Sequence, residues 1–254
     1  MLIISNVNIK RKLDFKKCDI YLNVESDIEY TTRLYSHTKE PEMANWFETF
    51  FEKGDIFYDI GANVGAYSLM ASKLFDGKVK VYAFEPGFIN FAKLSKNIFI
   101  NNSQENIIPI QIALSDQTRI DMFHYSNLTP GGALHALGKP IDYKGEVFEP
   151  IYKQPIIAFQ LDDFISIFNI PTPNHVKIDV DGIESKIIRG AQKTLCNPNL
   201  RSLIVEVDEK GLETPQMINF LRDQGFSIHS KYKYVDADHN EHVSKLFNYL
   251  FQKK

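Results

Sequence analysis

Short apolar runs alternate with amphipathic segments along most of this chain. The apolar runs have the length of buried strands, and the segments between them carry apolar residues at helical spacing. The strand-like runs are 55–60, 80–84, 107–114, 175–179 and 203–207. The helix-like segments are 41–51, 66–75, 88–101, 161–168, 183–195 and 215–224. Strands that alternate with helices predict parallel βαβ units, and therefore an α/β fold with a Rossmann-like, doubly wound and mostly parallel sheet.

Two stretches depart from this alternation. Residues 115–160 are rich in glycine and proline, so we expect loops and hairpins, inserted between the third and fourth strands of the sheet. Residues 1–40 have a mixed pattern and predict an N-terminal extension that packs on a main domain of residues 41–254. At the other end, 226–235 and 246–251 predict an antiparallel pair that closes the sheet.

Composition narrows the class of protein. The chain has 254 residues, of which 44% are hydrophobic, and this suits one α/β domain with a sizeable core. A net charge of −3 does not favour a nucleic-acid partner. The sequence has no apolar run of the roughly 18 residues that span a bilayer, and its N-terminus does not resemble a signal peptide, so we expect a cytoplasmic protein. Cys18 and Cys196 lack metal-binding spacing and are expected to be reduced thiols.

The most informative stretch is Asp59-Ile-Gly-Ala-Asn-Val-Gly65, between the first strand and the following helix. Ligands of open α/β sheets bind at this end of the strands, and Gly61 and Gly65 allow close approach of the backbone. The spacing is not that of dinucleotide enzymes, and the lysine of a phosphate-binding loop is absent. Asp59 would repel a pyrophosphate, whereas it suits a cationic amino group.

Glu85 ends the next strand, where a carboxylate can accept hydrogen bonds from ribose hydroxyls. Taken alone, Asp59 could cap a turn and Glu85 could be a solvated loop residue. Their order along the chain, together with the glycine loop, favours a nucleoside cofactor that has an amino group and no phosphate. S-adenosylmethionine is such a cofactor.

These motifs resemble the FkbM family of class I S-adenosylmethionine-dependent methyltransferases. The resemblance rests on 57–65, on Val79-Tyr-Ala-Phe-Glu-Pro86 and on Val176-Lys-Ile-Asp-Val-Asp-Gly-Ile-Glu184, and it covers about residues 38–210. It implies methyl transfer to a hydroxyl oxygen of a sugar, glycan or natural product. The family often has glutamate where this chain has Asp181. Residues 1–37 and 117–155 match nothing in the family pattern, and we expect these segments to determine which acceptor is methylated.

The resemblance also implies a set of cofactor-binding residues. Asp59, Gly61, Asn63 and Gly65 would line the methionine part, and Glu85 would hold the ribose. Ala113, Ser115 and Asp116 would flank the adenine. Glu40 is a weaker candidate for the edge of this site.

Acidic residues at the carboxyl ends of the fourth and fifth strands are the candidates for chemistry: Asp179, Asp181 and Glu206. Methyl transfer to a neutral hydroxyl benefits from a general base, and one of these carboxylates could serve. They could instead hold a hard divalent cation, which we do not favour. A structural interpretation is also open, in which Lys177 pairs with Asp179 and Asp181 forms a turn.

Other residues and functions stay open as alternatives. Glu184 could face the N-terminus of the next helix. His124 and His135, in the insertion, could act as the base, whereas His175 starts the fourth strand at the wrong end of the sheet.

The rival functions are a non-catalytic protein that keeps the cofactor fold, and a methyltransferase acting on a nucleic acid or protein. A nicotinamide-dependent oxidoreductase would need a tighter glycine spacing.

Overall fold

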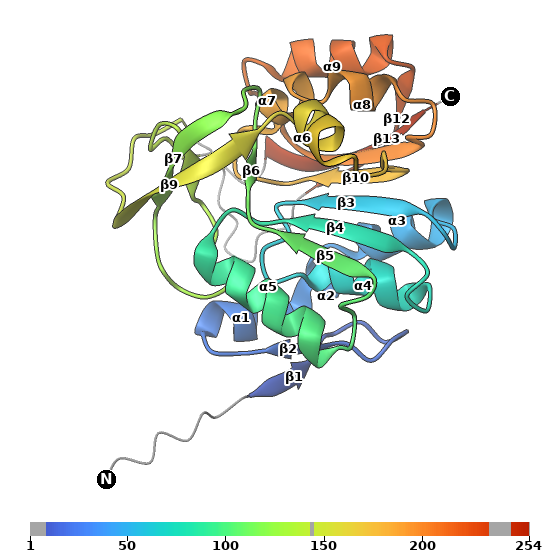
Figure 1. Ribbon diagram of the computed structural model, residues 1–254, viewed down its shortest axis with the longest axis vertical. Helices are drawn as coiled ribbons and strands as arrows, with labels where there is room; N and C mark the ends of the chain where they lie inside the picture. The colour runs from blue at the N-terminus through green and yellow to red at the C-terminus, as the bar shows by residue number, and fades with distance from the viewer. Residues whose placement is uncertain (1–8, 143–144, 234–244, 254) are drawn as a thin grey trace.

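The computed structural model describes residues 9–142, 145–233 and 245–253. Its centre is a seven-stranded sheet with helices on both faces (Figure 1). The strand order is β12-β13-β11-β10-β3-β4-β5, and β13 is antiparallel to both of its neighbours. The predicted α/β class, with a mostly parallel doubly wound sheet, is therefore confirmed. The strands of this sheet are β3 (Ile56–Ile60), β4 (Lys80–Phe84), β5 (Ile107–Ile110), β10 (His175–Ile178), β11 (Ser202–Asp208), β12 (Phe226–Lys233) and β13 (Leu246–Lys253).

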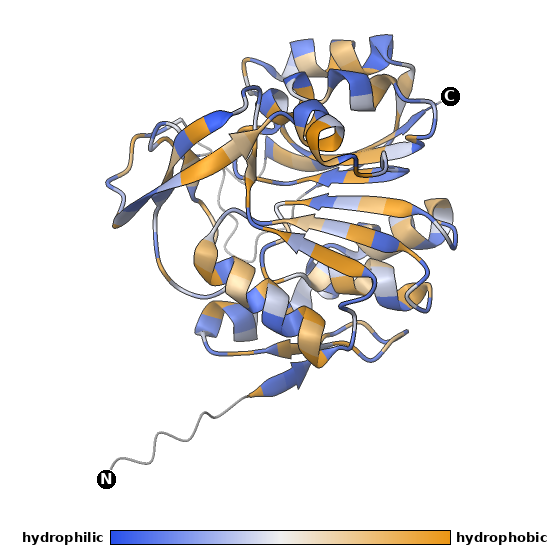
Figure 2. Cartoon of the chain, viewed as in Figure 1, coloured by the Kyte–Doolittle hydropathy of each residue, from blue (hydrophilic) through white to orange (hydrophobic). Residues whose placement is uncertain are grey.

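Alternating side chains divide the core into one layer on each face of the sheet. On β3, Phe57 packs with the helices of one face, and Tyr58 and Ile60 pack with those of the other. Figure 2 shows the apolar residues concentrated on the central strands and on the helices beside them. On one face lie α3 (Pro41–Phe50), α4 (Ala66–Leu74) and α5 (Phe88–Ile100). On the other lie α6 (Leu161–Phe168), α7 (Glu184–Arg189), α8 (Gln192–Cys196) and α9 (Thr214–Asp223).

The N-terminal segment packs beside α5 (Figure 1). Its elements are β1 (Lys10–Lys12), β2 (Tyr21–Asn23), α1 (Asp27–Thr31), the 3₁₀ helix η1 (Arg33–Tyr35) and α2 (Ser36–Lys39). Phe15 and Leu22 are buried in the same core as Trp46 and Leu94. The segment therefore shares the core of the sheet domain along the described residues.

The inserted segment forms a second, four-stranded sheet of order β6-β9-β7-β8. Its strands are β6 (Ala113–Leu114), β7 (Arg119–Tyr125), β8 (Ala136–Leu137) and β9 (Tyr152–Phe159). The expected hairpins are present, since β7 pairs antiparallel with β8 and β9. The single third strand predicted over 107–114 is wrong: 107–110 pair with β4, but Ala113 and Leu114 pair with β9 in the second sheet.

The helix predicted over 183–195 is also wrong, because it is divided at Gly190. A Cβ atom at Gly190 would lie 2.1 Å from the carbonyl oxygen of Ser115, so the backbone approaches that carbonyl too closely for any side chain. The glycine within the predicted helix was the signal for this break. The predicted closing pair is confirmed as β12 and β13, although Val235 lies outside the described residues.

A buried polar group secures the amino ends of the central strands. His175 Nδ1 lies 2.7 Å from Ser202 Oγ, and its Nε2 lies 3.1 Å from Asp55 Oδ2. Trp46 Nε1 donates to Ser202 Oγ over 2.8 Å, and Phe51 stacks on the imidazole. Burial lowers the pKa of His175. His175 is fully buried at the edge opposite the glycine loop, as expected from its place at the start of a strand.

No helix within the described ranges combines the length and the apolar character needed to cross a bilayer.

Candidate active site

The glycine loop after β3 lies directly against the end of β10. Gly61 has a φ of +81°, and a Cβ atom there would lie 1.9 Å from the carbonyl oxygen of Asp179. Gly65 has a φ of +86°, and its Cβ would lie 2.5 Å from Leu94. The backbone contact requires a glycine at 61 and brings the loop against Asp179, whereas at 65 the positive φ favours a glycine.

Glu85 is fixed by two backbone donors at the end of β4. The backbone N–H of Asn63 donates to Oε2 over 2.9 Å, and that of Gly87 donates to Oε1 over 2.8 Å. Burial raises the pKa of Glu85 to about 7, and the two N–H groups oppose that rise. The carboxyl group is therefore buried, oriented and close to its titration point at neutral pH.

Two cavities open along this edge of the sheet, with volumes of about 520 Å³ and 310 Å³. Glu85, Asn90 and Ala113 line the first cavity. Glu40, Tyr67 and Glu206 line the second. The residues that line both are Gly61, Asn63, Ala133, Asp179 and Asp181. The two cavities therefore meet at the loop after β3 and the end of β10.

The three candidate acids all line the second cavity, but their environments differ. Lys177 Nζ lies 3.0 Å from Asp179 Oδ2, and this ion pair lowers the pKa of Asp179 although burial opposes it. Burial and then the charge of Asp179 raise the pKa of Asp181 to about 6, and its Oδ2 accepts the Leu134 N–H over 2.7 Å. Burial, followed by the neighbouring acids, raises the pKa of Glu206 well above its usual value.

The structural alternative considered for Lys177 is observed, whereas Glu184 begins α7 and directs its carboxylate to the turn before that helix. Lys177 pairs with Asp179, as just described. Glu184 Oε1 accepts the N–H groups of Val180 and Gly182 over 3.2 and 3.0 Å, and burial raises its pKa to about 7. Glu184 thus stabilises the turn that carries Asp181, which has a φ of +61°.

Asp59 occupies a different place from the other loop residues. It is fully buried, accepts a hydrogen bond from Ser68 Oγ over 2.6 Å, and has its Oδ1 3.6 Å from Lys177 Nζ. Neither Asp59 nor Gly65 is among the described residues that line the two cavities. Asp59 therefore acts on the site through Lys177, which lies between Asp59 and Asp179.

The residues expected to flank the adenine also differ in whether they line a cavity. Ala113 lines the first cavity together with Ile112 and Leu114. Ser115 instead donates its backbone N–H to Phe159 over 2.8 Å, and Asp116 forms an ion pair with Arg189 at 3.2 Å. Neither Ser115 nor Asp116 is among the described residues that line these two cavities.

The two histidines of the insertion, His124 and His135, differ in their access to the first cavity. His135 lines the first cavity, and burial lowers its pKa to about 4. His124 is buried, with Nε2 2.9 Å from the carbonyl oxygen of Gly138, and the described cavity walls do not include it. Of the two, only His135 is placed to meet a ligand.

Glu40, the weaker candidate for the edge of the cofactor site, lines the second cavity. The sequence analysis did not identify Tyr67, which lies beside it. The hydroxyl of Tyr67 donates to Glu40 Oε2, and Lys177 Nζ lies 5.5 Å from the centre of the Tyr67 ring. Asn90 was missed as well. Buried polar residues at 90, 93 and 97 on an otherwise apolar helix face were the available signal, because such a stripe requires polar partners.

Among the described residues, no group of three or more histidine, cysteine, aspartate or glutamate side chains is arranged to hold a metal ion.

The sheet order, the glycine loop after β3 and the acid after β4 together define a class I methyltransferase fold. The chain belongs to the FkbM family of methyltransferases: the methyltransferase FkbM domain model matches residues 59–228. The family and fold point to S-adenosylmethionine as the cofactor.

Two curated relatives show how the family match extends. The hexuronic acid methyltransferase AglP of Haloferax volcanii is 26% identical over 156 residues, which are 61% of this chain and 57% of that protein. The 31-O-demethyl-FK506 methyltransferase FkbM of Streptomyces tacrolimicus is 26% identical over 195 residues, covering 69% of this chain and 74% of that protein. The chain thus spans little more than half the length of the first relative.

Similar solved structures support the fold alone. A precorrin-6y C5,15-methyltransferase from Geobacter metallireducens has a TM-score of 0.51 and 13% identity, covering 85% of this chain and 90% of its own. The tRNA m1G37 methyltransferase of M. jannaschii has a TM-score of 0.50 and 13% identity, covering 98% of this chain and 58% of its own.

The residues present fit S-adenosylmethionine. Glu85 offers an oriented carboxylate for hydroxyl donors, and Asn63 Oδ1 is a buried acceptor without a hydrogen-bond partner in the described structure. A buried acceptor of this kind is costly unless a ligand or water supplies a donor. Asn63 lines both cavities, so a donor at their junction would satisfy it.

Proposed function

We propose that this protein transfers the methyl group of S-adenosylmethionine to a hydroxyl oxygen of a sugar, glycan or natural-product acceptor. The observation that carries the proposal is the meeting of the two cavities at Asp179 and Asp181, with Glu85 on one side and Tyr67 on the other. The nucleoside half of the cofactor would lie in the first cavity, and the amino-acid half in the second.

The bound cofactor supplies an activated methyl group on a sulfonium, so the protein has to position the acceptor and remove its proton. Proximity and orientation of this kind contribute about 7–11 kcal/mol in favourable cases. The glycine loop and the end of β10, which lie against each other, together fix the lining of the junction.

Asp181 is the best placed of the three acids to accept the proton. Its pKa of about 6 leaves it ionised at neutral pH and still basic, which is the condition that favours a general base. Asp179 is a weaker base because Lys177 stabilises its ionised form. Burial and the neighbouring acids raise the pKa of Glu206 well above its usual value, which favours its protonated form and makes it the less suitable proton acceptor.

The class of acceptor is supported by the relatives and by the fold. One relative is named as a methyltransferase of hexuronic acid, and another as one of 31-O-demethyl-FK506. The second sheet and the N-terminal segment lie outside the motifs shared with the family. Residues of both segments line the cavities beside the junction, where an acceptor would enter.

The test is a screen of sugars, glycans and hydroxylated natural products with S-adenosylmethionine labelled in its methyl group. Transfer of label to one acceptor, in an ether that resists mild base, supports the proposal. Cofactor binding without transfer to any hydroxylated acceptor would favour the non-catalytic alternative, and label on an amine would overturn O-methylation.

A further inference from the structure

The amino-acid half of S-adenosylmethionine carries a carboxylate, and nothing described so far binds it. The second cavity contains acids, among them Glu40 and Asp179, whose negative charges would repel that group. An anion is stable there only beside a cation. In the described lining of this cavity the cations are Arg33, Lys39 and Lys177.

Lys177 is already engaged, because it lies between Asp59 and Asp179 at 3.6 and 3.0 Å. Lys39 lies 3.5 Å from Glu40. Arg33 differs from both lysines. Its Nε donates to the carbonyl oxygen of Gly131 over 2.9 Å, and no described residue bonds its Nη1 or Nη2 atoms.

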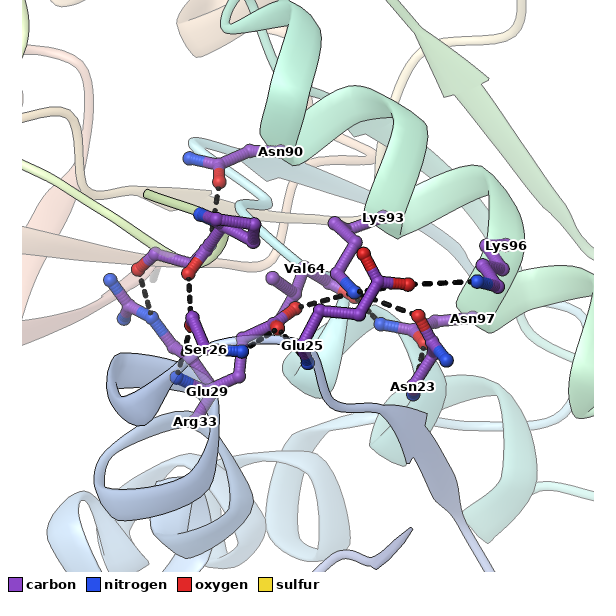
Figure 3. Close-up of polar contacts among 12 residues, drawn as sticks. Asn23, Glu25, Ser26, Glu29, Arg33, Val64, Asn90, Lys93, Lys96 and Asn97 are labelled. Atoms are coloured by element: carbon purple, nitrogen blue, oxygen red, sulfur yellow. Dashed lines mark hydrogen bonds and ion pairs between the residues drawn. The ribbon is translucent and has the colours of Figure 1, made fainter. Parts of the chain in front are cut away.

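Arg33 is held in place by the segment that precedes it (Figure 3). Ser26 caps α1 and also donates its hydroxyl to the carbonyl oxygen of Pro130 over 2.6 Å. Glu29 of the same helix forms an ion pair with Lys93 of α5 at 3.2 Å, where both side chains are buried. These contacts fix α1 against α5, and so fix the start of η1, where Arg33 lies.

The loop that Arg33 contacts is itself tied to the site. Asn90 accepts the Gly131 N–H over 2.9 Å and donates to the Gly132 carbonyl over 2.9 Å. Asn63 donates to the same Gly132 carbonyl over 2.9 Å. The loop therefore joins the cofactor loop at Asn63 to the N-terminal segment at Arg33.

The charge of Arg33 reaches the acids at the junction. It opposes the burial-driven rise in the pKa of Asp181 and of Glu85, and Lys39 acts on Asp181 in the same direction. Arg33 therefore faces the junction from the N-terminal side, while its Nε–H is occupied by the loop.

We propose that the terminal nitrogens of Arg33 bind the carboxylate of the cofactor's methionine part, while its Nε holds the Gly131 loop over the junction. A guanidinium binds a carboxylate through two parallel hydrogen bonds, which fixes orientation as well as charge. This inference rests on the proposed function, since it concerns the same cofactor. It assigns a binding role to a residue of the N-terminal segment, outside the region that the family model matches.

The test compares two ligands by isothermal titration calorimetry: S-adenosylmethionine and its decarboxylated form, which keeps the nucleoside, sulfonium and amine. In Arg33→Met, we expect affinity for S-adenosylmethionine to fall about tenfold or more, the effect of losing charge-assisted hydrogen bonds. Affinity for the decarboxylated form should fall much less, because that ligand loses only the effect of the Nε contact with the Gly131 loop. That binding also shows that the variant is folded.

The control removes an arginine that is not among the described residues lining either cavity and leaves both Arg33 and the segment that positions it unaltered, and its affinity for the two ligands is compared with that of the unaltered protein. Arg222→Met, an exposed arginine of α9, should change neither affinity.

An equal loss for both ligands in Arg33→Met would overturn the inference, because it would make Arg33 only a support for the loop. Unchanged affinity for S-adenosylmethionine would overturn it as well. Unaltered protein that binds neither compound would refute the proposed function and this inference together, whereas unaltered protein that binds both equally well would refute only the inference.

Discussion

The backbone N–H of Asn63 donates to the Glu85 carboxylate over 2.9 Å and so joins the loops that follow adjacent strands of the sheet. The same residue donates its side-chain amide to the Gly132 carbonyl of the second sheet's loop. A carboxylate has four lone-pair positions, so Glu85 can still accept hydrogen bonds after its two backbone donors are counted. Asn63 thus fixes the orientation in which Glu85 meets a ligand.

Glu85→Ala should weaken the binding of S-adenosylmethionine by about 1.5–3 kcal/mol, the range for hydrogen bonds to a charged acceptor. Isothermal titration calorimetry measures this directly. Asp76→Ala, which removes an exposed carboxylate paired with Lys53, is the control and should bind normally. Normal affinity in the Glu85 variant would show that the ribose does not lie in the first cavity.

Cofactor affinity should also depend on pH through Glu85. Burial raises its pKa to about 7, and ribose hydroxyls donate more strongly to the ionised carboxylate than to the protonated carboxyl. Affinity should therefore be constant above that pKa and should fall as the pH is lowered through it, because the protonated form accepts weaker hydrogen bonds from the ribose. Glu85→Gln should abolish this dependence, and a dependence that persists in the variant would assign it to another group.

Asp181→Asn should lower kcat about 10²-fold or more and leave cofactor affinity nearly intact, because the amide keeps the shape and loses the basicity. In unaltered protein, kcat should rise with pH through about 6 and then level, since only the ionised carboxylate accepts a proton. Steady-state rates across pH would reveal both effects. If the variant keeps full activity, His135 becomes the next residue to replace.

Glu206→Gln should change kcat much less than Asp181→Asn. Burial and the neighbouring acids raise the pKa of Glu206 well above its usual value, which favours its protonated form, and the amide imitates that form. The comparison needs only initial rates at neutral pH for the two variants. A loss in Glu206→Gln as large as that in Asp181→Asn would reassign the base.

Gly61→Ala should destabilise the fold by more than the roughly 1–3 kcal/mol of backbone strain alone, because its Cβ would lie 1.9 Å from the Asp179 carbonyl oxygen. Gly54→Ala is the control. Its φ is +101°, but no atom lies within 4 Å of the added carbon, so it isolates the cost of the backbone conformation. Urea unfolding followed by circular dichroism compares the two, and equal losses would contradict the clash.

The parts of the site that follow directly from a strand could be predicted from the sequence. Gly61 and Glu85 each lie at the end of an apolar run, and a parallel sheet brings such ends together. Asp59 could be placed only in part: strand alternation turns its side chain to the face of Phe57, where Lys177 lies between it and Asp179.

The remaining parts depend on contacts between distant segments. Arg33 and Leu134 meet the site through folding of the N-terminal segment and the insertion, and no local spacing indicates those contacts. The division of the predicted third strand has the same cause, since Ala113 leaves the main sheet to pair with a strand that begins about 40 residues later.

Trp46, the chain's one tryptophan, donates to Ser202 at the amino ends of the strands. Its indole is fully enclosed and lies at the edge opposite both cavities. Its fluorescence should consequently report global unfolding and stay silent when a ligand enters at the carboxyl edge. Thermal unfolding can then be followed by the fluorescence of Trp46 with and without ligand. A shift in the melting temperature would measure stabilisation by the bound ligand, because the ligand does not itself alter the fluorescence of the folded protein.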